Sequence, residues 1–357
     1  MFKPLAYYKP DIHKTMLEAK KVFQDAKKHL GGNVTFRALP PSDISYYEEM
    51  DLTSYEFPKD NKRYAKDLCK LLEKSYDVRK EVDDNLIPVI TPNLGIGDYS
   101  AFVAGEIIFQ KDTSWSQPCL NELEDFRKLP KLGTAKWYKL FLDIIEEILK
   151  ISGPSGIPFN RGFFSPLDLA HALRGENIFY DFYDQPELLH EFLDYCADAT
   201  IMFAEDIHKV ARKYLKDSEY GLFYINGVIN MSEDIACMIS GELYQEFCAP
   251  HTQKVIDHFG DGHMHTHSRS MYLVKEICSL NNVVNMWLPT DPNAPKPIEH
   301  AAQLAIDSRG TLLAIDCEKF EDIITHFDQM KKGNFSVTLP VKDIEEAIKL
   351  TEEFKKL

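Results

Sequence analysis

Eight strand candidates, seven of them separated from the next by a helix-like stretch, restrict the fold more than any other feature of the sequence. All but the histidine-containing fifth candidate are rich in apolar residues, many of them β-branched or aromatic, as strands are. The eight candidates cover residues 33–39, 87–93, 157–164, 220–227, 262–269, 283–289, 311–316 and 334–340. Eight strands that alternate with helices make up a (β/α)8 barrel. The sequence therefore predicts an α/β protein with the (β/α)8 TIM-barrel fold.

The helical pattern is clearest at the two ends of the chain and near its middle. Residues 11–31 carry apolar residues at helical spacing and end at a pair of glycines, which predicts a helix before the first strand. Residues 62–81, 136–150 and 343–356 are also predicted helices. No proline-, glycine- or serine-rich linker divides the 357 residues, so we expect a single domain over residues 1–357 with an N-terminal helical extension.

The chain is acidic, with 41 lysine and arginine residues against 56 aspartate and glutamate residues and a formal net charge of −15 at pH 7. A surface of this charge repels the phosphates of nucleic acids and the headgroups of anionic lipids. We therefore expect neither a nucleic acid nor a membrane as a partner.

The cysteines and the N-terminus indicate a cytoplasmic protein. The 7 cysteines are scattered and form no Cys-x-x-Cys pair, which is typical of reduced thiols rather than of a disulfide framework. The first ten residues lack the apolar core of a signal peptide. A membrane-spanning helix needs a run of about 18 apolar residues, and the sequence contains none.

Three histidines, His263, His265 and His267, alternate within five residues at the end of the fifth predicted strand. Successive side chains of a strand point to opposite faces, so these imidazoles share one face. The outgoing ends of barrel strands carry the active site. The segment can therefore offer two or three imidazoles to one metal ion or one substrate, although such histidines also serve as simple hydrogen-bonding groups.

A catalytic zinc site needs three protein ligands and one open position. His265 and His267 are the first pair, and we expect Cys317, directly after the strand that ends at Asp316, as the third ligand. The competing third ligands are His263, Glu233, Asp234 and Asp316. The alternative for Cys317 is a small buried side chain without a ligand function.

Further polar and aromatic residues end or follow the predicted strands. Glu233 and Asp234, on the loop after the fourth strand, are the candidates for proton transfer. The candidates for substrate contact are Arg37, Asn93, Arg161, Asn226 and Trp287. The two arginines suit a substrate carboxylate but equally bridge local acids, and a tryptophan is more often a packing residue than a substrate wall.

Several segments share a common resemblance. Residues 165–175 read SPLDLAHALRG, residues 186–190 read PELLH and residues 238–247 read MISGELYQEF. Together with the segment His265-Thr266-His267, they resemble the uroporphyrinogen decarboxylase superfamily, in particular its cobamide-dependent methyltransferase branch. The resemblance implies a (β/α)8 barrel that binds zinc through a His-x-Cys segment and a further cysteine near the final strand.

The chain departs from that pattern in three places. His265 matches the histidine of the family, but His267 stands where the first cysteine would be, and the final strand, residues 334–340, contains no cysteine. The Arg-Gln-Ala-Gly-Arg signature of the true decarboxylases is also absent, since the corresponding segment around Arg37 offers one arginine. Cys317 is thus a substitute for the third zinc ligand that the family has elsewhere.

The resemblance implies transfer of a methyl group between a small methylated substrate and a corrinoid, with zinc as the Lewis acid. The chain contains no Asp-x-His-x-x-Gly signature of cobalamin binding, so we expect the corrinoid on a separate partner protein. The alternatives are a decarboxylase acting on a tetrapyrrole, a metal-dependent hydrolase, and a barrel that binds a ligand or a corrinoid protein without chemistry. The oligomeric state stays open, with a homodimer among the options.

Overall fold

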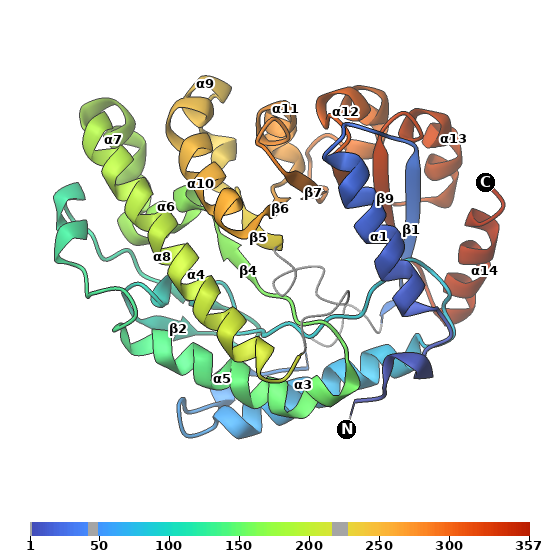
Figure 1. Ribbon diagram of the computed structural model, residues 1–357, viewed down its shortest axis with the longest axis horizontal. Helices are drawn as coiled ribbons and strands as arrows, with labels where there is room; N and C mark the ends of the chain where they lie inside the picture. The colour runs from blue at the N-terminus through green and yellow to red at the C-terminus, as the bar shows by residue number, and fades with distance from the viewer. Residues whose placement is uncertain (1, 42–48, 216–227) are drawn as a thin grey trace.

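The computed structural model describes residues 2–41, 49–215 and 228–357. Seven parallel strands form one sheet in the order β1-β9-β8-β7-β6-β5-β4 (Figure 1). They are β1 (Asn33–Leu39), β4 (Gly162–Phe164), β5 (Val228–Ser232), β6 (Asp261–His265), β7 (Val283–Leu288), β8 (Leu312–Asp316) and β9 (Asn334–Pro340). From β4 to β9 neighbours in the sheet are also neighbours in the chain, as in parallel sheets whose strands are joined by helices.

The sheet has the strand order of a TIM barrel, but no continuous ladder joins β1 to β4 in the described part of the chain. The predicted second strand, residues 87–93, makes one bridge, from Ile90 to Phe159. Pro88 and Pro92 explain this, because proline lacks the N–H group that a ladder requires. The fold is therefore TIM-barrel-like with seven regular strands, and the prediction of a second regular strand was wrong.

Helices cover the outer face of the sheet (Figure 1). The longer ones are α3 (Asn61–Val78), α5 (Lys136–Ser152), α6 (Pro166–Arg174), α8 (Pro186–Arg212), α10 (Ala249–Phe259), α13 (Phe320–Met330) and α14 (Ile344–Phe354). The shorter elements are α4 (Asp98–Ala101), α7 (Ile178–Asp184), α9 (Gly241–Leu243), α11 (Val274–Ile277), α12 (Ala301–Asp307) and the hairpin of β2 (Ile107–Phe109) and β3 (Ser114–Ser116). The helices predicted at residues 62–81, 136–150 and 343–356 are confirmed as α3, α5 and α14.

Side chains alternate between the two faces of the sheet, as strand geometry requires. Met264, Met286 and Ile315 are fully buried in the main hydrophobic cluster between the sheet and the helices. His263 and His265 flank Met264 on β6 and point to the inner face. The sequence places polar side chains on this inner face, where a barrel enzyme needs them.

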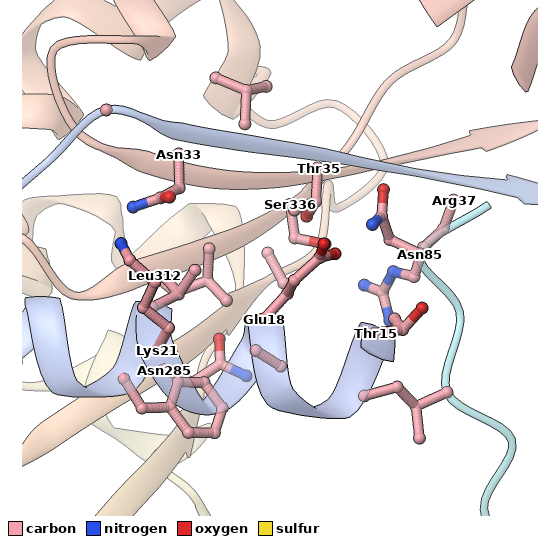
Figure 2. Close-up of a pocket in the computed structure, with 17 residues that line it drawn as sticks. Thr15, Glu18, Lys21, Asn33, Thr35, Arg37, Asn85, Asn285, Leu312 and Ser336 are labelled. Carbon is pink, nitrogen blue, oxygen red and sulfur yellow. The ribbon is translucent and has the colours of Figure 1, made fainter. Parts of the chain in front are cut away.

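Helix α1 (Ile12–Ala26) packs on the inner side of the sheet (Figure 1). Ile12 and Met16 in its first half belong to the main cluster, whereas its second half forms a small separate cluster of Val22, Phe23 and Ala26 with Val284 and Leu312. Figure 2 shows α1 running below β1, with polar side chains in the space between them. The predicted N-terminal helix is therefore present, and it lines the space on the inner side of the sheet.

The predicted fourth strand, residues 220–227, lies outside the described residues, and the described strand at this place in the order is β5. None of the described helices combines the length and the apolarity that crossing a bilayer requires.

Candidate functional site

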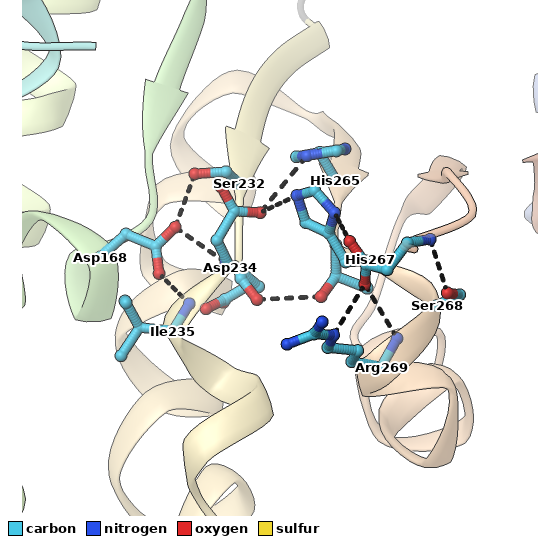
Figure 3. A network of polar contacts seen from close by, with 11 residues as sticks. Asp168, Ser232, Asp234, Ile235, His265, His267, Ser268 and Arg269 are labelled. Atoms are coloured by element: carbon cyan, nitrogen blue, oxygen red, sulfur yellow. Dashed lines mark hydrogen bonds and ion pairs between the residues drawn. The ribbon is translucent and has the colours of Figure 1, made fainter. Parts of the chain in front are cut away.

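The ends of β5 and β6 bring three candidate ligands together. These strands are neighbours, and Ser232 pairs with His265, so the residues after Ser232 lie beside the histidine segment. The Oδ1 atom of Asp234 lies 3.3 Å from Nε2 of His265 and 3.6 Å from Nε2 of His267 (Figure 3). One carboxylate and two imidazoles thus meet at the C-terminal edge of the sheet.

The Asp234, His265 and His267 side chains fit a zinc ion. A tetrahedral ion with bonds of about 2.0–2.1 Å keeps its ligand atoms about 3.3–3.4 Å apart. The two separations from Asp234 are 3.3 and 3.6 Å, and one donor atom from each residue lies within 4.8 Å of the other two. Within residues 2–41, 49–215 and 228–357 no second group of this kind occurs. Three ligands leave the fourth position open for a substrate atom.

Burial sets the protonation of two of these groups. It lowers the pKa of His265 to about 3, with the nearby His267 and His263 adding to the shift, so this imidazole is neutral. Burial, followed by the charges of Glu233 and Asp291, raises the pKa of Asp234 to about 7. A cation at this site therefore competes with a single proton on Asp234 near neutral pH.

Asp291 orients His267. Its Oδ1 atom lies 2.8 Å from Nδ1 of His267, which turns Nε2 of the same ring toward Asp234. Asp291 is itself held by the backbone N–H of Arg269, which donates to its carboxylate, and by its own N–H, which donates to the hydroxyl of Ser268. Carboxylates that fix a metal-binding histidine in this way are common around zinc.

Asp168, in the first turn of α6, fixes Asp234 from the other side. Its carboxylate accepts the hydroxyl of Ser232 at 2.6 Å and the backbone N–H groups of Asp234 and Ile235 at 2.9 and 3.0 Å (Figure 3). Burial, followed by the charge of Asp234, raises the pKa of Asp168 to about 7. The turn after β5 is thus held in one conformation by a buried side chain.

Glu233 points away from the histidines. It is fully buried, and its carboxylate accepts hydroxyl hydrogen bonds from Ser165 at 2.8 Å, Tyr244 at 3.1 Å and Thr252 at 2.8 Å. The two consecutive carboxylates thus have different surroundings, since that of Asp234 lies beside His265 and His267. Of the two predicted proton-transfer residues, the structure brings Asp234 alone to the candidate site.

Cys317 does not join the group either. It is buried after β8, and its thiol donates to the carbonyl oxygen of Lys319 at 2.8 Å. Burial raises the pKa of this thiol to about 11, so the protonated form prevails at neutral pH. Since β8 is separated from β6 by β7, Cys317 lies two strands from the histidines, and Asp234 takes the place predicted for it.

The two remaining competitors for the third ligand have other contacts. The Nδ1 atom of His263 lies 2.8 Å from the side-chain nitrogen of Asn285, and burial lowers the pKa of this imidazole to about 4. Asp316 accepts the backbone N–H of Thr290 at 3.3 Å.

Arg161, predicted to contact substrate, is committed to a buried ion pair. Its side chain is 3% exposed, and its two terminal nitrogens donate to the carboxylate of Asp98 at 2.9 and 3.0 Å. The guanidinium also lies 4.9 Å from the centre of the Tyr99 ring. Arg161 therefore joins α4 to the strand region before β4 rather than facing the site.

The other predicted substrate residues fall in different places. Trp287 is 44% exposed, and its ring lies 4.6 Å from the ring of His265, so it borders the candidate site. The backbone of Asn93 is tied to the hydroxyl of Tyr64. Asn226 lies outside the described residues.

Sequence reasoning missed Asp168 and Asp291. Asp168 follows the N-cap residue Ser165 by three residues, and an acid at this position of a helix is sufficiently explained by its first turn. Asp291 comes three residues after the end of β7, so the rule that strand ends carry the site could have found it.

Neither a model of a known protein family nor a curated protein sequence matches the chain. Among solved structures, a methyltransferase from Methanosarcina mazei is similar, with a TM-score of 0.62 and 12% sequence identity. The match covers 94% of this chain and 99% of that chain. The likeness shows that the two chains share a fold over nearly their whole lengths.

Proposed function

We propose that the protein is a methyltransferase that moves a methyl group between a small methylated substrate and a corrinoid carried by a separate protein, assisted by zinc bound to Asp234, His265 and His267. The convergence of these three side chains at the C-terminal ends of β5 and β6 carries the proposal. Barrel enzymes build their active sites at such strand ends. The fold shared with the Methanosarcina mazei methyltransferase supports it.

In this proposal the chain is a distant member of the uroporphyrinogen decarboxylase superfamily. The position of His265 and His267, which corresponds to the His-x-Cys segment of the methyltransferase branch, supports that placement. The carboxylate of Asp234 stands where a thiolate would otherwise complete the donor set.

Zinc at this position supplies a Lewis acid that polarises the oxygen, sulfur or nitrogen atom of the substrate. The residues of the chain prepare the site for it. Asp168 fixes the turn that presents Asp234, and Asp291 holds the ring of His267. Trp287 offers an aromatic wall beside His265 for the methyl-bearing part of the substrate.

Metal analysis of protein purified without a histidine tag tests the proposal. We expect about one zinc per chain in the wild type and its loss in the double variant His265→Ala/His267→Ala. The matched control is His171→Ala/His258→Ala, because these two histidines contact Glu176 and Glu205 and are not among the three candidate ligands. Equal zinc content in the wild type and the His265→Ala/His267→Ala variant would contradict the proposal that these histidines bind zinc.

Activity is measured with a methylated corrinoid, whose absorbance changes when the methyl group leaves. We expect turnover with a suitable acceptor in the zinc-loaded wild type and none in the His265→Ala/His267→Ala variant. A zinc-loaded protein that leaves every methylated corrinoid unchanged would argue against methyl transfer while leaving the metal site intact.

A metal-dependent hydrolase is the second candidate, because two histidines and one carboxylate also hold zinc in hydrolytic enzymes. Hydrolysis of ester or amide substrates by the zinc-loaded protein, without any corrinoid, would favour this function over methyl transfer.

A further inference from the structure

A second polar space lies inside the fold, between α1 and the inner face of β1, β7, β8 and β9 (Figure 2). Its volume is about 510 Å³, within the range of about 300–1,000 Å³ that small-molecule sites occupy. Leu312 and Phe23 form part of its wall. The polar residues that line it are Thr15, Glu18, Lys21, Asn33, Thr35, Arg37, Asn85, Asn285 and Ser336. A space of this size, with both apolar and polar groups in its wall, can hold a small molecule that carries polar groups.

Arg37 places a positive charge on the β1 side of this cavity. It lies on β1, and its Nε atom is buried without a hydrogen-bond partner. In the described part of the chain its guanidinium makes no ion pair with a carboxylate. The acids around it have other contacts: Asp84 binds Arg79 at 2.7 Å, and Asp316 accepts the N–H of Thr290. Glu18, which lines the same cavity, lies 3.7 Å from the ammonium group of Lys14. Burial accordingly lowers the pKa of Arg37.

Three arginines that are more fully buried than Arg37 each have an acidic partner. Arg79, Arg161 and Arg174 each donate to a carboxylate, at 2.7, 2.9 and 2.9 Å. A buried guanidinium without a counter-ion is costly, because it has lost its water without gaining a partner. Arg37 therefore differs from three residues of its own type by having an open cavity where the others have an acid.

We propose that this cavity binds a small ligand that carries a carboxylate, with Arg37 as its counter-ion. A guanidinium offers parallel N–H groups that match the two oxygens of a carboxylate. Asn85, whose backbone N–H donates to Phe36 beside Arg37, and Asn285 supply amide groups for further hydrogen bonds. The buried Oδ1 atom of Asn285 has no partner, so it is available to a hydroxyl or amine of the same ligand.

This site is distinct from the candidate zinc site. The contact between Asn285 and His263, at 2.8 Å, lies between the cavity and the end of β6 where His265 stands. The proposal does not depend on zinc or on methyl transfer, and it is tested in metal-free protein.

The test measures the melting temperature in excess chelator with acetate, lactate or succinate up to about 100 mM, against sodium chloride of equal ionic strength. Ligands that bind the folded state stabilise it by mass action. We expect at least one carboxylate to raise the melting temperature of the wild type by about 3 °C or more relative to chloride. In Arg37→Met the carboxylate should add nothing beyond chloride.

The melting temperature of the Arg37→Met variant without a carboxylate ligand provides an independent test. Removal of a buried charge that has no counter-ion should leave the melting temperature in chloride unchanged or higher. The matched control is Lys21→Met, which removes a cation at the exposed rim of the same cavity that is already paired with Asp25 at 2.6 Å. This control should keep the response to carboxylate.

Three results would overturn the proposal. One is a wild type that responds to all three carboxylates no more than to chloride. Another is an Arg37→Met variant that melts several degrees lower in chloride, since Arg37 would then have a structural function. The third is a Lys21→Met variant that loses the response as fully as Arg37→Met, which would indicate general charge screening. The variant His265→Ala/His267→Ala should keep the response, so a failed zinc site leaves this outcome unchanged.

Discussion

The carboxylate of Asp168 accepts the backbone N–H of Asp234 at 2.9 Å, so an acid on α6 fixes the acid that faces the two histidines. The same carboxylate holds the next N–H, that of Ile235, and the hydroxyl of Ser232 at the end of β5. Three hydrogen bonds from one buried side chain leave the turn little freedom. The geometry of the candidate zinc site therefore depends on a residue that contributes no ligand to it.

We expect Asp168→Asn to lower zinc affinity by about 10–100-fold, as loss of a group that orients a metal ligand typically does. The amide nitrogen cannot accept the N–H groups of Asp234 and Ile235 as the carboxylate does, so the turn loosens. Competition with a chromophoric chelator measures the affinity, and circular dichroism checks folding. Ser232→Ala removes one of the three donors and should have a smaller effect. A folded Asp168→Asn variant with wild-type affinity would contradict this account.

Zinc affinity should fall as the pH decreases through about 7. Burial raises the pKa of Asp234 to about 7, and zinc binds the carboxylate form, so binding below that pH releases the proton of Asp234. The pKa of His265 is lowered to about 3, so this imidazole adds no pH dependence in the same range. The apparent affinity measured at pH 5, 6 and 8 should fall up to about tenfold for each pH unit below 7.

Asp234→Asn is the control for that pH dependence. It should bind zinc more weakly, and the part of the pH dependence that Asp234 contributes should disappear. An undiminished slope in this variant would assign the proton to a different residue.

The stability of the metal-free protein should decrease as the pH rises from about 5 to 8. Burial, with the charge of Asp168 adding to it, raises the pKa of Glu233 from 4.5 to about 8. The folded protein therefore keeps a proton that the unfolded chain releases, and stability that is complete below pH 4.5 is lost as the pH rises through the folded pKa. Urea denaturation at several pH values measures the slope.

Glu233→Gln should flatten part of this slope, because it removes the titrating group. Near pH 5 the variant should be less stable by about 1 kcal/mol, since the amide pairs less well with the three hydroxyls. At pH 8.5 it should match or exceed the wild type. Glu187→Gln, an exposed residue at the start of α8, is the control and should leave the slope unchanged. A Glu233→Gln slope equal to that of the wild type would contradict the assignment.

Much of the fold follows from local sequence pattern. Helices α3, α5 and α14 and strands β1, β7 and β9 lie where apolar periodicity predicts them, because that periodicity reports which side of an element is buried. The prediction of a regular strand at residues 87–93 was wrong because the apolar composition of this segment is typical of a buried strand. Pro88 and Pro92 were present in the segment and argue against a regular ladder.

The two histidines of the candidate site could be predicted, because they belong to one segment of the sequence. The third ligand could not, because it comes from a second segment. His265 and His267 share a face because of their spacing alone. The third partner depends on which strand lies beside β6, and that is β5, which precedes Asp234, rather than β8, which precedes Cys317. The choice between Glu233 and Asp234 depends on which of these two consecutive side chains points toward the histidines. Local sequence pattern predicts neither the neighbour of β6 nor the acid that faces the histidines.

The buried pair of Asp98 and Arg161 should be structural. Asp98→Asn leaves a guanidinium that is 3% exposed without its carboxylate, which should lower the free energy of unfolding by about 3–5 kcal/mol. The exposed pair of Lys139 and Asp143 is the comparison, and Asp143→Asn should cost less than about 1 kcal/mol. Urea denaturation measures both. If Asp98→Asn retained full stability, the substrate function predicted for Arg161 would return.

Cys317→Ser should leave zinc content unchanged, whereas Asp234→Ala should reduce it strongly. The thiol of Cys317 donates to the carbonyl of Lys319, and a serine hydroxyl can make the same hydrogen bond, so the variant should fold normally. Burial raises the pKa of the thiol to about 11, and zinc binds the thiolate, so deprotonation opposes Cys317 as a ligand at neutral pH. Asp234 already lies 3.3 and 3.6 Å from the two imidazoles. Zinc measured in both variants, purified side by side, separates the two ligand sets. Loss of zinc in Cys317→Ser with retention in Asp234→Ala would establish the thiolate set and require β8 to approach β6 when metal binds.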